Sequence, residues 1–233
     1  KLKHRPQTDT DIHGQTMMSH RGVSKGRRGY WGWVPDKPDQ RDYLYRAIKP
    51  VIRLPNKVDL CPFCSLVEDQ GALGSCTANA LAGNIEFLDN KPDAQYRDVS
   101  RLFIYYNERV LEGTVEYDSG ASLRDGIKTL RKSGVCWESS WPYRITYFTK
   151  KPSQKCYDEA MARRITAYHR IISLREMLTC LADGFPFVFG FTVYESFESP
   201  KVTKTGIVTM PTKDERVIGG HAVMAVGYEK RTN

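Results

Sequence analysis

The sequence predicts an α+β protein in which helices come first along the chain and strands come later. In the first half of the chain, apolar residues recur at three- and four-residue steps, which is typical of amphipathic helices. After Phe185 the apolar runs are short and rich in Val, Phe, Tyr and Ile, which is typical of strands. The 233 residues, 40% of them hydrophobic, suffice for a full core in one large domain or two lobes.

Four helices are expected, at residues 76–88, 100–112, 122–134 and 173–183. The first follows a turn that contains Gly71 and Gly74, and Ser122 and Ser173 each begin a capping-box pattern. Strands are expected at residues 185–194, 206–210 and 221–228. No run approaches the roughly 18 apolar residues of a membrane-spanning helix, so we expect no membrane span.

Cys76 stands in the first turn of the first predicted helix, where free N–H groups and the helix dipole favour a negative charge. A thiol at this position loses its proton more easily, and the thiolate is the nucleophile. The alternative is that Cys76 is only a small buried residue. His221 follows two glycines at the head of an apolar, strand-like run. A Cys and a His far apart in the sequence are typical of a thiol nucleophile and its proton acceptor.

Five short motifs stand in order along the chain: Asp69-Gln70-Gly71, Gly74-Ser75-Cys76, Asp118-Ser119-Gly120, Trp141-Pro142-Tyr143 and Gly220-His221-Ala222 with Val226-Gly227-Tyr228. Together they resemble the motifs of the papain-like cysteine peptidases, in a bacterial form. They span about residues 55–229 in the order of that family. The resemblance implies a peptidase domain over residues 54–233, with a helical lobe at about 54–135, a β-barrel-like lobe at about 136–233, and an active-site cleft between the lobes.

The resemblance also implies a role for each residue. Cys76 is expected to attack a peptide carbonyl, His221 to pair with the thiolate and protonate the leaving amine, and Gln70 to stabilise the oxyanion with the backbone N–H of Cys76. The substrate is expected to lie along Ser119, Gly120, Ala121 and Gly190. No cofactor is implied. A turn or buried role for Gln70, and an ordinary turn role for Gly120, are the alternatives. The family's third catalytic residue, an Asn, is expected beyond Asn233.

Cys61-Pro62-Phe63-Cys64 is a CxxC motif. A structural zinc site needs four ligands, and no second pair or histidine couplet completes one, so we interpret both as structural thiols and expect no metal. Leu73 occupies the position that carries a disulfide partner in the resembled family.

Residues 1–53 carry most of the net positive charge, with 12 Lys and Arg against 5 Asp. Residues 1–29 have no apolar period and are expected to be disordered. Tyr30, Trp31 and Trp33 follow as an aromatic cluster. We expect the segment to be an inhibitory pro-segment over the cleft, as in a zymogen, with residues 14–29 over the thiol. Packing of the cluster on the body without inhibition is the alternative. No signal peptide is visible, and the compartment is not assigned.

Two other functions fit parts of the sequence. The first is a non-catalytic protein of the same fold whose arm contacts phosphate or nucleic acid, since Lys25, Arg27 and Arg28 adjoin the aromatic cluster. No nucleic-acid motif supports it, and the rest of the chain is nearly neutral. The second is an acyltransferase with the same Cys–His chemistry, for which no acyl-donor site is visible.

Overall fold

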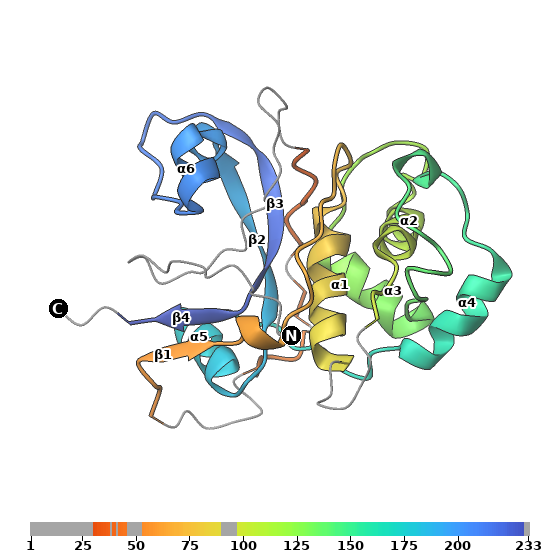
Figure 1. Cartoon of the computed structure of the whole chain (residues 1–233), viewed down its shortest axis with the longest axis horizontal. Helices are drawn as coiled ribbons and strands as arrows, with labels where there is room; N and C mark the ends of the chain where they lie inside the picture. Colours follow the sequence, from red (N-terminus) through yellow and green to blue (C-terminus); the bar gives the residue numbers. More distant parts are fainter. Residues whose placement is uncertain (1–29, 38, 41, 46–52, 90–96, 231–233) are drawn as a thin grey trace, which may run out of the picture.

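The computed structural model describes residues 30–37, 39–40, 42–45, 53–89 and 97–230. Helices α1 to α4 form one lobe, and the strands with α5 and α6 form the other (Figure 1). The helices are α1 (Cys76–Asp89), α2 (Arg101–Glu112), α3 (Leu123–Ser133), α4 (Gln154–Ala160), α5 (Leu174–Ala182) and α6 (Pro200–Thr205). The strands are β1 (Lys57–Asp59), β2 (Phe187–Tyr194), β3 (Val217–Ala225) and β4 (Gly227–Glu229). Short 3₁₀ turns η2 (Cys61–Phe63), η3 (Ile145–Tyr147), η4 (Met161–Arg163) and η5 (Glu195–Glu198) lie between these elements.

Serine caps fix where several helices begin. The side chains of Ser100, Ser122 and Ser173 each accept a hydrogen bond from the backbone N–H three residues later. A fourth serine, Ser153, caps α4 in the same way, and α4 is a helix that our sequence analysis missed. The four predicted helices are all present, because their caps and apolar stripes are local signals that need no distant partner.

The helical lobe encloses the larger core, which is built from α1, α2 and α3 with residues from the segments that follow them. Leu102, Phe103 and Tyr105 on α2 are fully buried. Cys156 and Ala160 of α4 belong to the same core, so the chain returns to this lobe after residue 136. Leu88 on α1 and Val110 on α2, two apolar residues of the predicted helices, are exposed. Each lies near the end of its helix, beyond the buried face.

The described strands form two antiparallel pairs, β2 with β3 and β1 with β4. A second, smaller core lies between them and includes Leu60, Leu181 and Val226. The predicted run at residues 221–228 is divided between β3 and β4 at Val226. Mixed helix and sheet confirm the α+β prediction, whereas the described residues form no closed barrel.

The predicted strand at residues 206–210 is wrong. Gly206 has a left-handed backbone and ends α6, and the following residues form no ladder. Met210 at the end of this run is 90% exposed. Apolar composition alone cannot make a strand where no neighbouring strand offers hydrogen bonds.

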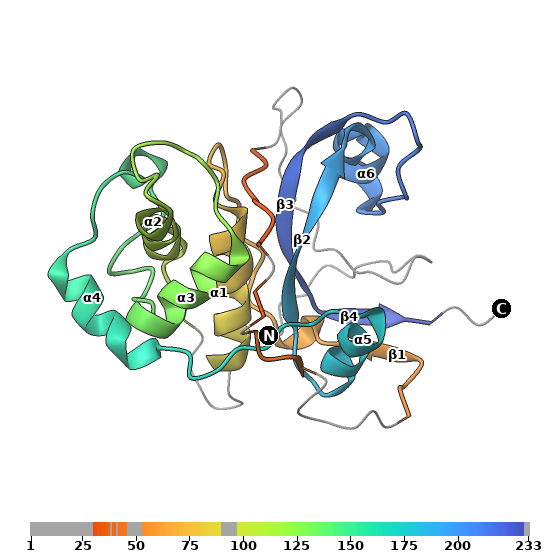
Figure 2. The ribbon, with the colours of Figure 1, turned by 180° about the vertical axis from the view of Figure 1, so that it is seen from behind.

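The described part of the N-terminal segment runs between the two lobes, as the view from behind shows (Figure 2). Near its end it pairs with the β-rich lobe, because Tyr45 N–H donates to Arg170 O and Arg170 N–H donates to Tyr43 O. Within the described parts of the chain, no helix combines the length and apolar character needed to cross a membrane.

Candidate active site

Cys76 is the first residue of α1 and is almost completely buried. Its surroundings correct one prediction. Burial raises the pKa of the Cys76 thiol to about 11, although backbone N–H groups of Ala222, Gly32 and Thr77 lower it. We predicted a lowered pKa from the helix start alone. The desolvation of the thiol outweighs the helix terminus and these hydrogen bonds.

His221 lies on β3, buried and opposite Phe191 of β2 in the strand register. Its ring is 5.0 Å from that of Trp31 and 5.8 Å from that of Phe191, measured between centroids. The next residue on the strand, Ala222, contacts Cys76 through its backbone. The fold therefore brings the predicted nucleophile and the predicted base to facing walls of the same cleft, one from each lobe.

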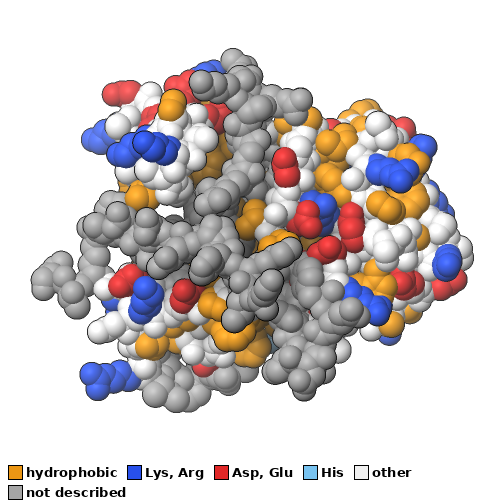
Figure 3. All heavy atoms as spheres, in the orientation of Figure 1, with side chains coloured by type: hydrophobic (Ala, Val, Ile, Leu, Met, Phe, Trp, Pro, Cys, Tyr) orange, Lys and Arg blue, Asp and Glu red, His pale blue; other side chains and the backbone are white. Residues whose placement is uncertain are grey.

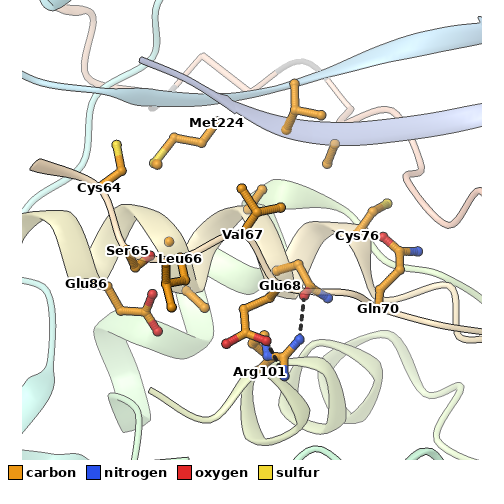
Figure 4. Close-up of a pocket in the computed structure, with 16 residues that line it drawn as sticks. Cys64, Ser65, Leu66, Val67, Glu68, Gln70, Cys76, Glu86, Arg101 and Met224 are labelled. Carbon is orange, nitrogen blue, oxygen red and sulfur yellow. Dashed lines mark hydrogen bonds and ion pairs between the residues drawn. The ribbon is translucent and has the colours of Figure 1, made fainter. Parts of the chain in front are cut away.

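Gln70 points its side-chain amide into the same region. Gln70 and Cys76 line a small cavity of about 80 Å³ between the lobes (Figure 4). The amide Nε2 donates two hydrogen bonds, to Leu73 O at 2.9 Å and to Tyr30 O at 3.0 Å. Because both neighbours are acceptors, the nitrogen of the amide must face them.

Gly120 and Ala121 form one wall of the cleft. Ala121 N–H donates to Gly32 O at 2.8 Å, and Val34 N–H donates to Ala121 O at 3.0 Å. Gly120 has a positive φ of 69°, and a Cβ placed there would lie 1.9 Å from Gly32 O, so only glycine fits. Ser119 turns its hydroxyl to Thr114 and to Gly120 O, and so supports the turn.

Gly190 lies on the opposite wall, on β2. A Cβ placed there would be 1.9 Å from the indole ring of Trp33. The neighbouring strand contributes Gly220, whose O accepts a 2.9 Å hydrogen bond from Trp33 N–H. These two glycines lie diagonally across the strand pair, and because neither has a side chain they leave a recess that the Trp33 ring fills.

Residues 30–34 are the segment that reaches these groups. Tyr30 contacts Gln70, Trp31 contacts His221, and Gly32 contacts Cys76. The register that we predicted, with residues 14–29 over the thiol, lies outside the described residues, and the contacts with the thiol come from Gly32 instead. The sequence did contain a signal for this register, because Gly32 is a residue without a side chain between two tryptophans and can approach the thiol closely.

Tyr143 and Asp118 also belong to the site, although the sequence analysis gave neither residue a role of its own. Tyr143 OH donates to Gln70 O at 2.9 Å and also lies 2.5 Å from Ser75 Oγ. Asp118 accepts hydrogen bonds from Gly74 N–H at 3.0 Å to each carboxylate oxygen. Both hold the turn that leads into Cys76, and no local pattern reveals this because the partners are distant in the sequence.

Cys61 and Cys64 are free thiols in and after η2. Burial raises the pKa of Cys61 to about 12 and that of Cys64 to about 11, so both stay protonated at neutral pH. Among the residues that the structure describes, no group of three or more His, Cys, Asp or Glu side chains is arranged to hold a metal ion.

The nucleic-acid interpretation needs free aromatic faces. Trp31 is packed edge-on against His221 and Phe197, and Trp33 against Gly190, so neither indole is available for stacking. Lys25, Arg27 and Arg28 lie outside the described residues. On the face drawn in Figure 3, acidic and basic side chains are interspersed on the helical lobe, without a broad basic patch.

Comparison with known proteins gives a consistent result. Residues 54–233 match the family model described as papain family cysteine protease. The solved structure of xylellain, a cysteine protease from Xylella fastidiosa, is 43% identical, with a TM-score of 0.77 over 89% of this chain and 83% of that one. An uncharacterised peptidase C1-like protein of Acanthamoeba polyphaga mimivirus is 42% identical over 227 residues, which is 86% of this chain and 73% of the viral protein. Procathepsin B S9 from Trypanosoma congolense is 19% identical with a TM-score of 0.56, over 78% of this chain and 64% of that one, and shares the fold.

Proposed function

The chain belongs to the papain family of cysteine proteases and is a hydrolase that acts on peptide bonds, and from this premise we propose that Cys76 and His221 carry the reaction and that residues 30–45 restrain it. In this mechanism the Cys76 thiol gives its proton to His221, and the resulting thiolate attacks the peptide carbonyl carbon to form an acyl-enzyme. The C–N bond breaks as His221 gives its proton to the leaving amine. Water then attacks the thioester, His221 accepts its proton, and the acid product leaves.

Gln70 is the proposed oxyanion donor, together with the backbone N–H of Cys76. Its Nε2 has two hydrogens. One is held by Leu73 O, which fixes the amide, and the other is directed at Tyr30 O. A substrate's carbonyl oxygen would take the place of Tyr30 O. Donors that are already oriented before the reaction stabilise developing charge without reorganising, which is why one such donor contributes roughly 2.7–4 kcal/mol to catalysis.

The restraint rests on how closely residues 30–34 fit the cleft. A Cβ placed on Gly32 would lie 1.8 Å from Gly74 O, so the backbone of the segment is in direct contact with the turn that precedes the nucleophile. Trp31 and Trp33 pack against the β wall on the other side. A substrate backbone cannot occupy the same space, so the segment must leave before a peptide binds.

Charged groups hold the segment further along the cleft. Arg124, near the start of α3, pairs with Asp39 at 3.2 Å and with Asp42 at 2.5 Å. Its backbone N–H donates to Asp36 at 3.0 Å, which places a carboxylate at the helix N-terminus. Only 11% of the Arg124 side chain is exposed, so these pairs are screened less than ordinary surface pairs. An intramolecular segment also needs only modest affinity to compete with a substrate.

The recess at Gly190 and Gly220 is the proposed substrate subsite with the clearest shape. Trp33 fills it in the described chain, and the absence of two side chains gives a large planar group the room it needs. We infer that substrates place an aromatic side chain there once the segment has left, with their backbone along Gly120 and Ala121.

One observation carries the proposal: consecutive residues of the segment, Tyr30, Trp31 and Gly32, contact the proposed oxyanion donor, base and nucleophile in turn. Deleting residues 1–29 leaves all these contacts in place, so the test must change Gly32. In Gly32→Ala the added methyl collides with Gly74 O, so the segment can no longer bind in the cleft in this position.

The experiment measures the rate at which an epoxide thiol inhibitor labels Cys76, with mass spectrometry to locate the adduct. We expect Gly32→Ala to speed labelling by at least about tenfold, because losing 1.4 kcal/mol of segment binding already changes an equilibrium tenfold. Gly83→Ala is the matched control, since its Cβ would meet only Met224 Cε and Sδ, the nearer at 3.6 Å. An unchanged rate in Gly32→Ala, with the fold intact by circular dichroism, would contradict the restraint. An adduct elsewhere than Cys76 would contradict the assignment of the nucleophile.

A further inference from the structure

The peptide group between Leu73 and Gly74 is held from two sides. Its carbonyl oxygen accepts the 2.9 Å hydrogen bond from Gln70 Nε2. Its N–H donates to Asp118, at 3.0 Å to Oδ1 and 3.0 Å to Oδ2. The C=O and N–H of a trans peptide group point in opposite directions within one plane. A carboxylate that fixes the N–H therefore fixes the direction in which the carbonyl points, and that carbonyl holds the Gln70 amide.

Asp118 is itself held by the core of the helical lobe. Tyr105 OH donates to Asp118 Oδ1, and Tyr105 is fully buried on α2. Gly120 N–H donates to the same hydroxyl at 3.1 Å. The Arg109 guanidinium lies 4.2 Å from the Tyr105 ring centroid and is also fully buried. Burial and Asp118 hold the pKa of Tyr105 well above its ordinary value, so the phenol remains a donor.

The turn before the nucleophile and the cleft wall are thus bonded to the same pair of side chains, Asp118 and Tyr105. Gly74, in the turn, donates to Asp118, and Gly120, in the cleft wall, donates to the Tyr105 hydroxyl. Because Tyr105 lies on α2, it connects both loops to that helix. These hydrogen bonds connect the turn at Gly74 to the loop at Asp118.

We propose that Asp118 is a positioning residue of the active site: it orients the Leu73–Gly74 peptide group so that the Gln70 amide is directed at the reacting carbonyl oxygen. This inference rests on the proposed role of Gln70. A carboxylate suits the task because both of its oxygens are acceptors, so the N–H of Gly74 is satisfied whichever way the side chain rotates. A charged acceptor also makes a stronger hydrogen bond than a neutral one.

A double-mutant cycle tests the inference in the full chain carrying Gly32→Ala, in which the cleft is open. Peptide hydrolysis is compared in Gln70→Ala, in Asp118→Ala and in the combination. We expect Gln70→Ala to lower kcat/KM about 10²-fold, as for one oxyanion donor. Asp118→Ala should lower it about tenfold through kcat, and by less than about twofold when Gln70 is already Ala. Glu116→Ala is the control, because it removes the same charge from the same exposed loop.

A second measurement separates orientation of the donor from general damage. Alkylation of Cys76 by iodoacetamide forms no oxyanion, so Asp118→Ala should leave its rate unchanged, whereas affinity for a peptide aldehyde should fall about tenfold. Tyr105→Phe should act in the same direction but more weakly, and it serves as the second variant if Asp118→Ala does not fold.

Equal losses from Asp118→Ala with and without Gln70, or a parallel loss in alkylation, would overturn the role of Asp118. Full activity in Gln70→Ala would instead overturn the proposed oxyanion donor, which is a separate failure.

Discussion

The two walls of the cleft hold the same segment by different chemistry. We call the wall with Gln70, Gly120 and Ala121 the helical wall, and the wall with Gly190 and Gly220 the β wall. Around residues 30–34 the helical wall contacts the backbone of the segment: Ala121 pairs with Gly32 and Val34, and the Gln70 side chain donates to Tyr30 O. The β wall adds one backbone hydrogen bond, from Trp33, but presents rings and glycines to the two tryptophans. The helical wall can therefore accept any extended chain, whereas the β wall discriminates between side chains.

The walls also differ in how they are built. Beneath the helical wall lie fully buried charged groups, Glu108 and Arg109, together with the Tyr105 network. The β wall is a two-stranded ladder in which all but two residues of β2 are only partly buried. The helical wall, which contacts the backbone of the segment, is therefore supported by a buried core. The β wall facing it has only two strands and takes its shape from two glycines. Three predictions test this contrast: two concern activity, with the larger effect first, and the third concerns stability.

The largest effect is expected from removing one catalytic group on each wall. Cys76→Ala and His221→Ala should each lower peptide hydrolysis on the order of 10⁴-fold or more, and the double variant should lose no more than either alone, because the two act as one unit. Steady-state kinetics of the three variants in the Gly32→Ala chain provide the measurement. Activity above about 1% of the parent in Cys76→Ala would show that the helical wall does not carry the nucleophile.

A smaller, selective effect is expected from filling the recess of the β wall. Gly190→Ala places a methyl where the Trp33 ring lies, so a large planar side chain no longer fits. In the Gly32→Ala chain, kcat/KM for peptides with an aromatic residue at this subsite should fall about tenfold, while peptides with a small residue there change little. Thr192→Ala, on the same strand and exposed, is the control. An equal loss for both classes of peptide would mean that the β wall does not select side chains.

The third prediction concerns the stability of the helical wall and not activity. The pKa of Glu108 is raised to about 8, mainly by burial; Glu112 and Asp125 also raise it, and the Thr77 hydroxyl and Arg109 lower it. In the unfolded chain a Glu titrates near 4.3, so between these values the folded state holds a proton that the unfolded state has lost. The free energy of unfolding should therefore fall as pH rises from about 4.5 to about 8, by at most about 1.4 kcal/mol per pH unit, and level off above.

Glu108→Gln removes this titration. The variant should be more stable than the parent at pH 9 but show no such advantage at pH 4, as measured by urea unfolding across the range. Glu116→Gln, an exposed acid nearby in the sequence, should keep the parent's pH dependence. If Glu108→Gln keeps the parent's slope, the buried carboxyl is not what makes the helical wall sensitive to pH.

The sequence predicted the helical wall better than the β wall for a physical reason. Caps such as Ser100 and Ser122 lie within four residues of the groups they bind, so the pattern contains the whole interaction. Strands depend on partners elsewhere in the chain, which is why residues 206–210 read as a strand and are not one. β1, a strand of three residues that pairs with β4, was missed for the same reason.

The candidate site shows the same division. Cys76, His221 and Gln70 could be named as candidates because each stands in a short motif, and the fold places Gln70 and Cys76 at one cavity. The direction of the pKa shift of Cys76 could not be predicted, because it depends on burial by parts of the chain that are distant in the sequence. Asp118 was hidden for a related reason, since its partner Gly74 lies 44 residues away.

The pairing of β1 with β4 affects the order in which the two walls of the cleft are expected to fold. Tyr228 of β4 bonds to Pro55 O across 173 residues, whereas α1, α2 and α3 are joined by contacts between neighbours in the sequence. Local contacts form early in folding, and closure of a long loop is slow. We therefore expect a nascent chain to complete the wall that carries the thiol before the wall that carries the imidazole. During that interval the proposed nucleophile would be present without its proposed base, and the new chain would be inactive.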